Sequence, residues 1–230
     1  MPLYLVATPL GNLADISARA REVLGTARIL AAEDTRSARR LLSALGIALA
    51  GRELLSYGEH NEAELSGRLA LRLGAGEDVA LLSEGGTPLI SDPGYRLVRA
   101  AVEAGVAVVP VPGPCAAVAA LSASGLPVHA FLFRGFLPRK PGARQRMLDS
   151  LRDREETLIF YESPQRLGKV LPELSRVLGA DRRACLAREL TKLHEEFLRG
   201  TLGELELLVA SGKLPEKGEF TVLVEGKLRP

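Results

Sequence analysis

The residues best suited to chemistry lie in one loop, residues 83–94, with the sequence SEGGTPLISDPG. Gly85 and Gly86 allow a ligand to approach the backbone N–H and C=O groups closely, because neither carries a Cβ. Glu84 offers a carboxylate that accepts hydrogen bonds from hydroxyl or amine groups. This composition predicts a ligand-binding loop, and an ordinary Ω-like surface loop is the alternative interpretation.

Two shorter polar segments are further candidates. In the segment EHNE, residues 59–62, His60 is a candidate base or substrate contact, whereas capping of a helix by Asn61 explains the same segment structurally. In the segment EDTR, residues 33–36, Asp34 or Thr35 is expected to cap a helix. Arg36 would then either hold an anion or lie in solvent.

The strongest concentration of positive charge is in residues 134–154, which hold seven basic and two acidic residues. Phe133, Phe136 and Gly142 are interleaved with them. Such a stretch suits contact with a phosphate backbone, and a solvated helix face is the alternative. Residues 1–115 carry 11 basic and 13 acidic residues, and residues 116–230 carry 19 and 15. The second half is therefore the more basic one.

Several common chemistries lack their signatures. No G-x-G-x-x-G follows a strand-like segment, and G-x-x-x-x-G-K-[ST] and G-x-S-x-G do not occur. Cys115 and Cys185 form no C-x-x-C pair, and no His, Asp or Glu cluster has metal-ligand spacing. These absences disfavour a dinucleotide fold, a P-loop, nucleophilic hydrolysis and a metal site.

The elements that must position these loops alternate in the first half. Apolar segments expected to be strands are residues 3–8, 29–33, 54–57, 79–83 and 106–111, and the amphipathic helices expected between them are 17–24, 35–45, 61–73 and 95–104. Such alternation predicts a mostly parallel sheet with helices on both faces. Ligands of such sheets bind beyond the carboxyl ends of the strands, where the polar loops lie.

The second half predicts a mixed sheet. Its expected helices are residues 115–124, 143–152, 165–178 and 202–210, and its expected strands are 131–136, 157–161, 184–189, 195–200 and 220–224. We place the boundary near residues 112–115, giving domains 1–112 and 113–230. Hydrophobic residues make up 47% and charged residues 25% of the 230, as in soluble domains. No apolar run reaches the length of a membrane helix, and the chain starts on a strand-like segment, so we expect a cytoplasmic protein.

Eight segments in order resemble the tetrapyrrole-methylase superfamily, and within it the methyltransferases that act on RNA of the small ribosomal subunit. The segments are LYLVATPLGNL (3–13), AEDTR (32–36), HNE (60–62), GTPLISDPG (86–94), PGPCA (112–116), FYESP (160–164), RELTK (188–192) and KGE (217–219). The resemblance runs from about residue 3 to residue 226, nearly the whole chain.

This resemblance implies two α/β domains with S-adenosylmethionine in the cleft between them, in a homodimer. It also implies 2′-O-methylation of a cytidine in the decoding centre of 16S rRNA, on the small ribosomal subunit. Carried across motif by motif, the residues expected to contact the cofactor are Pro9, Leu10, Glu84, Gly85, Gly86, Thr87, Pro88, Cys115, Ala116, Tyr161, Arg188, Glu189, Gly218 and Glu219.

The sequence departs from the family pattern at two places. The family's fourth loop usually reads Ser-Asp-Ala-Gly-Thr-Pro, whereas Glu84 and Gly85 stand here in place of Asp and Ala. The family also commonly has a His two residues before His60, where this chain has Gly58. A two-histidine site is therefore not available.

Methyl transfer from a sulfonium to a ribose hydroxyl is an in-line displacement, so alignment of the partners supplies much of the acceleration. A group that accepts the hydroxyl proton helps further. By position, the candidates for this role are Glu59, His60, Glu62 and Lys192, and Lys192 is alternatively a phosphate contact. The residues expected to contact RNA are Arg36, Arg139, Lys140, Arg144 and Arg146.

Two other functions remain open on the sequence. One is a methyltransferase of the same fold acting on a tetrapyrrole, another small molecule or a protein side chain. The other is a non-enzymatic ribosome-binding protein with a decayed cofactor site, which the changes at Glu84 and Gly85 would favour.

Overall fold

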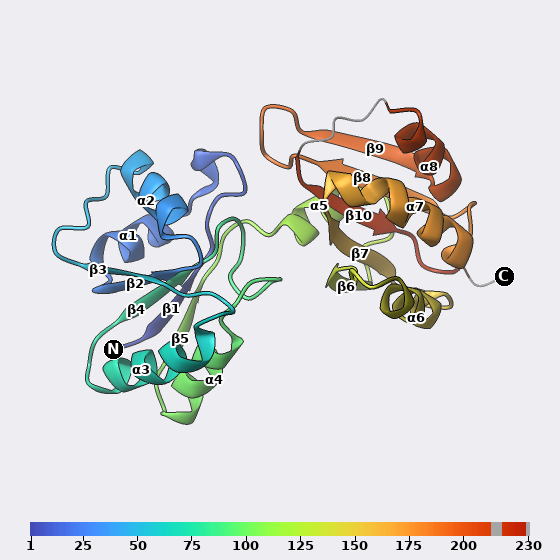
Figure 1. Cartoon of the computed structure of the whole chain (residues 1–230). Coiled ribbons are helices and arrows are strands. Elements are labelled where there is room, and N and C mark those ends of the chain that lie inside the picture. The colour runs from blue at the N-terminus through green and yellow to red at the C-terminus, as the bar shows by residue number, and fades with distance from the viewer. Residues whose placement is uncertain (213–217, 229–230) are drawn as a thin grey trace. The chain divides into compact units, whose positions relative to one another are not determined.

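The computed structural model describes residues 1–212 and 218–228. The chain divides into two compact units, unit 1 (Met1–Cys115) and unit 2 (Ala116–Pro230) (Figure 1). The division falls after Cys115, within the range 112–115 in which the sequence placed the boundary. Within the described residues, no helix is both long and apolar enough to cross a bilayer.

Unit 1 is built around a parallel sheet with the strand order β3-β2-β4-β1-β5. Its strands are β1 (Leu3–Val6), β2 (Ile29–Ala32), β3 (Glu53–Ser56), β4 (Val79–Leu82) and β5 (Val108–Val111). Its helices are the 3-10 turn η1 (Leu13–Asp15), α1 (Ala18–Thr26), α2 (Thr35–Ala44), α3 (Glu62–Gly74) and α4 (Tyr95–Glu103). The predicted parallel sheet is confirmed.

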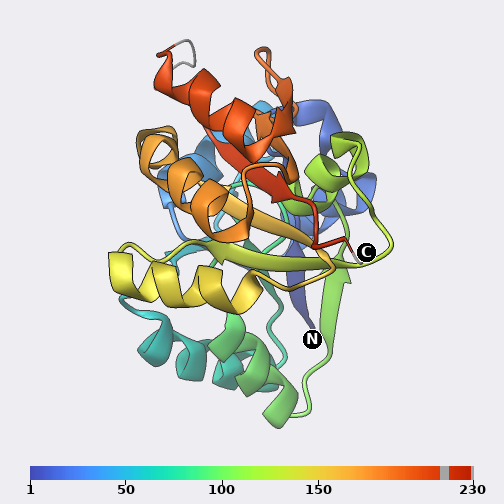
Figure 2. The same cartoon turned by 90° about the vertical axis from the view of Figure 1, so that its right-hand side faces the viewer.

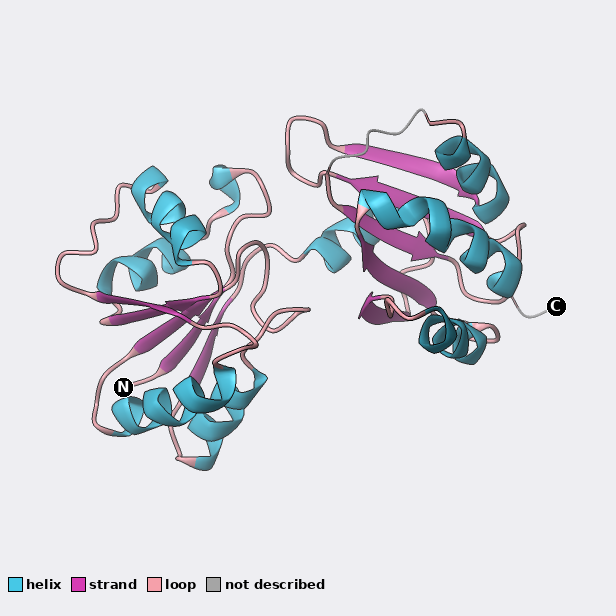
Figure 3. Ribbon diagram, in the orientation of Figure 1, coloured by secondary structure: helices cyan, strands magenta, loops and turns pink. Residues whose placement is uncertain are grey.

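The two faces of this sheet bury alternate residues of each strand, because successive side chains of a strand point to opposite faces. Leu30 and Leu82 pack against α1 and α2 on one face. Ile29 and Leu81 pack against α3 and α4 on the other. Figure 3 shows helices on both faces of this sheet. The near-continuous apolar strands of the sequence therefore reflect burial on both faces.

This arrangement gives β4 a special position. The chain leaves β4 towards α4 on one face, whereas it leaves the neighbouring strands β1 and β2 towards α1 and α2 on the opposite face. Adjacent strands whose connections diverge in this way leave a crevice at their carboxyl ends, where open α/β sheets bind ligands. β4 therefore has such a switch point on each of its two sides.

Unit 2 contains a mixed sheet, as predicted, and its strand order is β6-β7-β10-β8-β9. Its strands are β6 (Phe131–Phe136), β7 (Thr157–Glu162), β8 (Arg183–Arg188), β9 (Glu196–Thr201) and β10 (Phe220–Val224), and its helices are α5 (Ala116–Ser124), α6 (Pro141–Leu151), α7 (Pro164–Leu178) and α8 (Leu202–Ala210). The β6–β7 pair is parallel, and the other pairs are antiparallel.

Helices α6, α7 and α8 lie side by side on one face of this sheet (Figure 2). Leu158 and Phe160 of β7 face them in the core of unit 2. Tyr161, the next residue, points to the opposite face, where its hydroxyl accepts a hydrogen bond from the backbone N–H of Ala117 in α5 (3.1 Å). We refer to this opposite side as the α5 face.

Candidate functional site

The loops that follow β1 and β4 are joined directly at the carboxyl edge of unit 1. Thr8 and Gly86 exchange two backbone hydrogen bonds, each 2.9 Å long. The Thr8 hydroxyl also donates to the Ser83 carbonyl oxygen (3.1 Å), and the Ser83 hydroxyl donates to that of Gly86 (2.5 Å). These bonds fix the first residues of both loops at the switch point between β1 and β4.

Glycines allow a third loop, the one after β5, to reach the same place. A Cβ on Gly86 would lie 3.2 Å from Leu10 Cδ2 and 3.6 Å from the Pro114 carbonyl oxygen. A Cβ on Gly113 would lie 2.9 Å from the Cβ of Ala7, a distance that side chains do not tolerate. The Thr87 hydroxyl then donates to the Pro114 carbonyl oxygen (2.9 Å).

The sequence-predicted cofactor residues of unit 1 therefore converge. They are Pro9, Leu10, Glu84, Gly85, Gly86, Thr87, Pro88 and Cys115. They combine half-buried apolar side chains with backbone groups that glycine leaves accessible, a surface that fits the apolar and hydrogen-bonding parts of an adenosyl group. Their contact with a cofactor stays a prediction.

Packing does not explain why this chain has Gly85 where the family usually has Ala. A Cβ on Gly85 would lie 3.5 Å from the Pro9 carbonyl oxygen, an ordinary van der Waals distance, and its φ is not positive. The alanine usual in the family would fit this backbone. Either residue could therefore occupy position 85 without a change of the loop.

Carboxylates gather at the other switch point, between β2 and β4. A small pocket there is lined by Glu33, Asp34 and Glu84 together with apolar residues of α2. Burial raises the pKa of the nearby Asp92 carboxyl from 3.8 to about 6, and the charges of Glu33 and Glu84 add to this effect. Asp92 is not among the site residues predicted from the sequence, although its position in the 83–94 loop was a signal.

The second half of the 83–94 loop is held in an unusual conformation. Leu89 and Ser91 have φ values of 71° and 73°, in the left-handed region that favours glycine. The Glu62 carboxylate fixes the end of this loop, because its Oε1 accepts hydrogen bonds from the backbone N–H groups of Gly94 (2.9 Å) and Arg96 (3.2 Å). With 15% of its side chain exposed, Glu62 serves the position of the loop.

The segment around His60 differs from the expected helix cap. The Asn61 side chain does not cap α3: its Oδ1 accepts from the Gly58 N–H (2.8 Å), and its Nδ2 donates to the Ser56 carbonyl oxygen (2.8 Å). A Cβ on Gly58 would lie 3.2 Å from Nδ1 of His60. Glycine thus leaves room for the imidazole, which is exposed, as is Glu59.

The N-terminus of α2 matches the expectation for Asp34. Its carboxylate accepts a hydrogen bond from the Arg36 backbone N–H (2.8 Å), and this bond lowers the pKa of Asp34. The exposed Arg36 guanidinium lies 3.7 Å from the same carboxylate. Arg36 is therefore accessible to an anion, but it has an acidic neighbour.

In unit 2, two segments about thirty residues apart in the chain form one cluster. The Glu189 backbone N–H donates to the Glu219 carbonyl oxygen (3.0 Å), and the Glu219 N–H donates to Oε1 of the Glu189 side chain (3.0 Å). Gly218 has a φ of 120°, and a Cβ there would lie 3.0 Å from Glu189 Cγ. Lys192 Nζ donates to Glu189 (2.9 Å) and Glu219 (3.1 Å). Lys217 of the same motif lies outside the described residues.

The two carboxylates keep Lys192 charged. Partial burial by itself would lower the pKa of this amine, but the hydrogen bonds to Glu189 and Glu219 outweigh it and raise the pKa. An ammonium has no lone pair with which to accept a proton. Arg188, on the preceding strand end, lies 3.8 Å from Glu196.

Tyr161 belongs to an aromatic group on the α5 face. Its ring centroid lies 4.9 Å from that of Phe133 and 5.7 Å from that of Phe136, both in edge-to-face geometry. Its hydroxyl binds the second residue of α5, next to Ala116. The predicted cofactor residues Tyr161 and Ala116 thus lie close together within unit 2.

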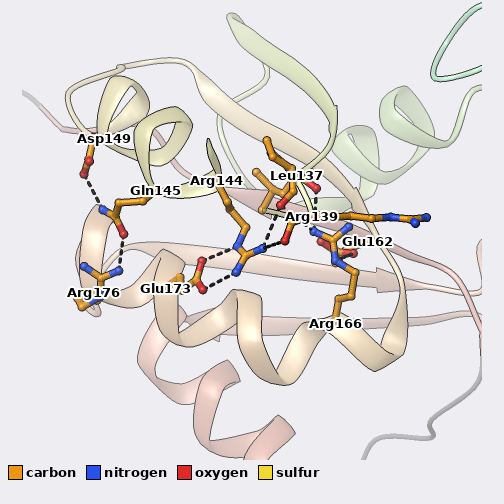
Figure 4. Close-up of polar contacts among 10 residues, drawn as sticks. Leu137, Arg139, Arg144, Gln145, Asp149, Glu162, Arg166, Glu173 and Arg176 are labelled. Carbon is orange, nitrogen blue, oxygen red and sulfur yellow. Dashed lines mark hydrogen bonds and ion pairs between the residues drawn. The ribbon is translucent and has the colours of Figure 1, made fainter. Parts of the chain in front are cut away.

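The structure gives Arg144 a role other than RNA contact. Arg144 is 6% exposed, and its guanidinium forms a two-point ion pair with Glu173, with distances of 2.5 and 2.6 Å (Figure 4). It also donates to the carbonyl oxygens of Pro138 and Arg139. A residue so placed joins α6 to α7, and we remove it from the RNA-contacting set.

Arg139, Lys140 and Arg146 remain in that set. All three are exposed, and the Arg139 side chain points away from the Arg144–Glu173 pair (Figure 4). Among the described residues, none of the three has an acidic side chain in ion-pair distance. Over residues 1–212 and 218–228, no group of His, Cys, Asp and Glu side chains could hold a metal ion.

Comparisons with known proteins agree over most of the chain. The sequence profile of the Tetrapyrrole (Corrin/Porphyrin) Methylases matches residues 2–206. A protein of Xylella fastidiosa named ribosomal RNA small subunit methyltransferase I is 51% identical over 224 residues, 97% of this chain and 81% of the relative. Its namesake in Pseudomonas aeruginosa is 51% identical over 228 residues, 99% of this chain and 80% of the relative.

A solved structure supports the fold. The uroporphyrin III C-methyl transferase of Thermus thermophilus superposes with a TM-score of 0.64 and 23% identity, covering 99% of this chain and 98% of that one. At this identity the likeness concerns the fold alone. On the sequence relatives and the matching profile, the chain belongs to the tetrapyrrole methylases and, among them, to the ribosomal RNA small subunit methyltransferase I family.

Proposed function

We propose that this methyltransferase transfers a methyl group from S-adenosylmethionine to the ribose 2′-oxygen of a cytidine in 16S rRNA, within the small ribosomal subunit. The names of its relatives support an rRNA substrate. The observation that supports S-adenosylmethionine as the cofactor is the convergence of three glycine-containing loops beyond β1, β4 and β5. When bound, the cofactor supplies an electrophilic methyl group on sulfur.

Pro9, Leu10 and the residues from Glu84 to Pro88 would hold this cofactor in unit 1, together with Cys115. In unit 2, Ala116, Tyr161, Glu189 and Gly218 are the corresponding candidates, with Arg188 and Glu219 beside them. The backbone bonds between Thr8 and Gly86 keep the loops in place before any ligand arrives. Such preorganisation lowers the entropic cost of binding.

The proton of the ribose hydroxyl needs an acceptor, and the contacts narrow the choice. Lys192 is held as an ammonium by two carboxylates and suits a phosphate better than a proton. Glu62 is occupied with the backbone of the 83–94 loop. Glu59 and His60 stay as candidates, and we add Asp92, which lies beside Glu33 and Glu84 with a pKa of about 6.

The proposal includes a homodimer in the cytoplasm, as in the family that the sequence resembles. Sedimentation analysis of the purified protein tests the first part: a single species of twice the 24.6 kDa chain mass is expected. A monomer at all concentrations would contradict it.

The activity is tested with methyl-tritiated S-adenosylmethionine and small ribosomal subunits from a strain that lacks this enzyme. Label retained in an alkali-resistant dinucleotide is expected, because 2′-O-methylation blocks alkaline cleavage at that linkage. Label in an alkali-sensitive nucleotide would place the methyl group on a base instead. No labelled RNA, with label on an added porphyrin or corrin, would move the substrate to the tetrapyrroles.

A further inference from the structure

The edge strand β6 carries a bulge that redirects one aromatic side chain. Phe133 is paired with Ile159 of β7, and Phe136 is paired with Tyr161, so three steps on β6 match two on β7. Gly135 supplies the left-handed backbone of this bulge, with a φ of 61°. Regular alternation would point Phe136 to the face opposite Phe133, whereas the bulge places both rings on the α5 face with Tyr161.

The ring of Phe136 is presented to solvent. The residue Phe136 remains 55% exposed although the ring of Tyr161 lies 5.7 Å away, and Phe133 also packs against Tyr161. Leaving a large aromatic ring in water is unfavourable, and a core position would bury it. A strand that uses a glycine bulge to hold a ring in this position has the geometry of a stacking platform.

The charges around the platform favour an anionic partner. Arg134 precedes the bulge, and Arg139 and Lys140 follow the strand, all three exposed. Within the described residues, none of them is in ion-pair distance of an acidic side chain. Positive charges repel the sulfonium of the methyl donor and attract phosphate, so they favour RNA over the cofactor as the partner of the ring.

We propose that Phe136 stacks against an unpaired nucleobase of the RNA substrate, while Arg134, Arg139 and Lys140 contact phosphates on either side of it. Proteins bind single-stranded RNA through this combination of aromatic stacking and basic side chains. The inference rests on the proposed function, since it takes RNA as the substrate. It adds a binding site for a base on β6, a strand with no residue expected to contact the cofactor, next to the cofactor candidate Tyr161.

The test compares Phe136→Leu, Phe136→Tyr and a matched control, Phe131→Leu. Phe131 lies at the other end of β6, roughly 16 Å away along the strand, and is 45% exposed. The affinity for unmethylated small subunits is measured for each protein in the presence of S-adenosylhomocysteine. The affinity for S-adenosylhomocysteine alone is measured by calorimetry, and thermal unfolding checks each fold.

Phe136→Leu is expected to weaken subunit binding about 5–100-fold, because leucine keeps the apolar volume but not the flat ring. Phe136→Tyr should retain binding, Phe131→Leu should stay within about twofold of the wild type, and cofactor affinity should not change. Unchanged subunit binding by Phe136→Leu would overturn the inference, and lost cofactor affinity would assign the ring to the cofactor instead. If the wild type itself bound no subunits, the proposed function would fail with it.

Discussion

Asp92 is held where its charge is unfavourable. Its pKa lies at about 6 in the folded chain, against 3.8 ordinarily, so the folded state keeps a proton that the unfolded chain releases. Between these two values the folded state binds more protons, and stability falls as the pH rises. Asp92 does not destabilise the fold below about pH 4, where it is protonated in both states, and its destabilising effect is complete above about pH 6. A group that destabilises the fold at working pH is a functional candidate.

Asp92→Asn is therefore expected to raise the free energy of unfolding at pH 8 by about 1–3 kcal/mol relative to the wild type, with the difference vanishing near pH 4. The same variant should lose methyl transfer if Asp92 accepts the proton. Denaturant unfolding at both pH values and the single-turnover rate check the two parts. A variant that is less stable at pH 8 would show that the carboxylate serves the fold.

Substitutions of Lys192 can distinguish a role as a positive charge from a role as the base that accepts the ribose hydroxyl proton. Arg is always protonated, so Lys192→Arg keeps the positive charge and cannot act as a base. Because the pKa of Lys192 is raised by Glu189 and Glu219, we expect this variant to retain most of the methyl-transfer rate. Lys192→Met should lose at least about tenfold, since it leaves two carboxylates without their cation. Comparable losses in both variants would reinstate a neutral amine as the base.

At the scale of the element, Arg144 stabilises the packing of α6 on α7. Removing one partner of a buried ion pair leaves the other uncompensated, so Arg144→Met is expected to cost about 3–5 kcal/mol of unfolding free energy. Replacing Glu173 by Met as well should recover much of this loss. Arg146→Met, an exposed control on the same helix, should change stability by no more than about 0.5 kcal/mol. Chemical denaturation provides all four values.

The sequence already contained the signal that Arg144 lies inside. Arg144, Leu148 and Leu151 are spaced i, i+4 and i+7, which places them on one face of a helix. A count of basic residues does not show on which helix face each residue lies. For this reason the basic stretch placed the buried Arg144 among the expected RNA contacts.

The strands, most helices and the convergence of loops in unit 1 followed from the sequence, because apolar segments buried on both faces and Gly-rich strand ends are local signals. The Lys192 cluster did not. Its carboxylates, Glu189 and Glu219, are thirty positions apart, and only the β8–β10 register brings them together. The bulge at Gly135 was equally hidden, since a lone glycine in a short strand fits a regular strand and a bulge alike.

For the whole molecule, the uneven charge predicts where RNA binds. Unit 1 carries 11 basic and 13 acidic residues, whereas the 115 residues of unit 2 carry 19 and 15. If Arg139, Lys140 and Arg146 each neutralise a phosphate, each contributes about 0.7–0.9 to the slope of log affinity against log salt concentration. The triple alanine variant should therefore flatten the slope for subunit binding by about 2–3 and weaken binding most at low salt.

A loss of net charge alone would weaken binding as well, so the control removes three charges elsewhere. Arg21, Arg40 and Lys169 are exposed and, among the described residues, have no acidic side chain in ion-pair distance. Their triple alanine variant has the same net charge as the first. Long-range attraction is screened within about 10 Å at 0.1 M salt, so the control should keep the wild-type slope above that concentration. Equal slopes in the two variants would mean that the net charge of the whole chain attracts RNA, and not contacts at Arg139, Lys140 and Arg146.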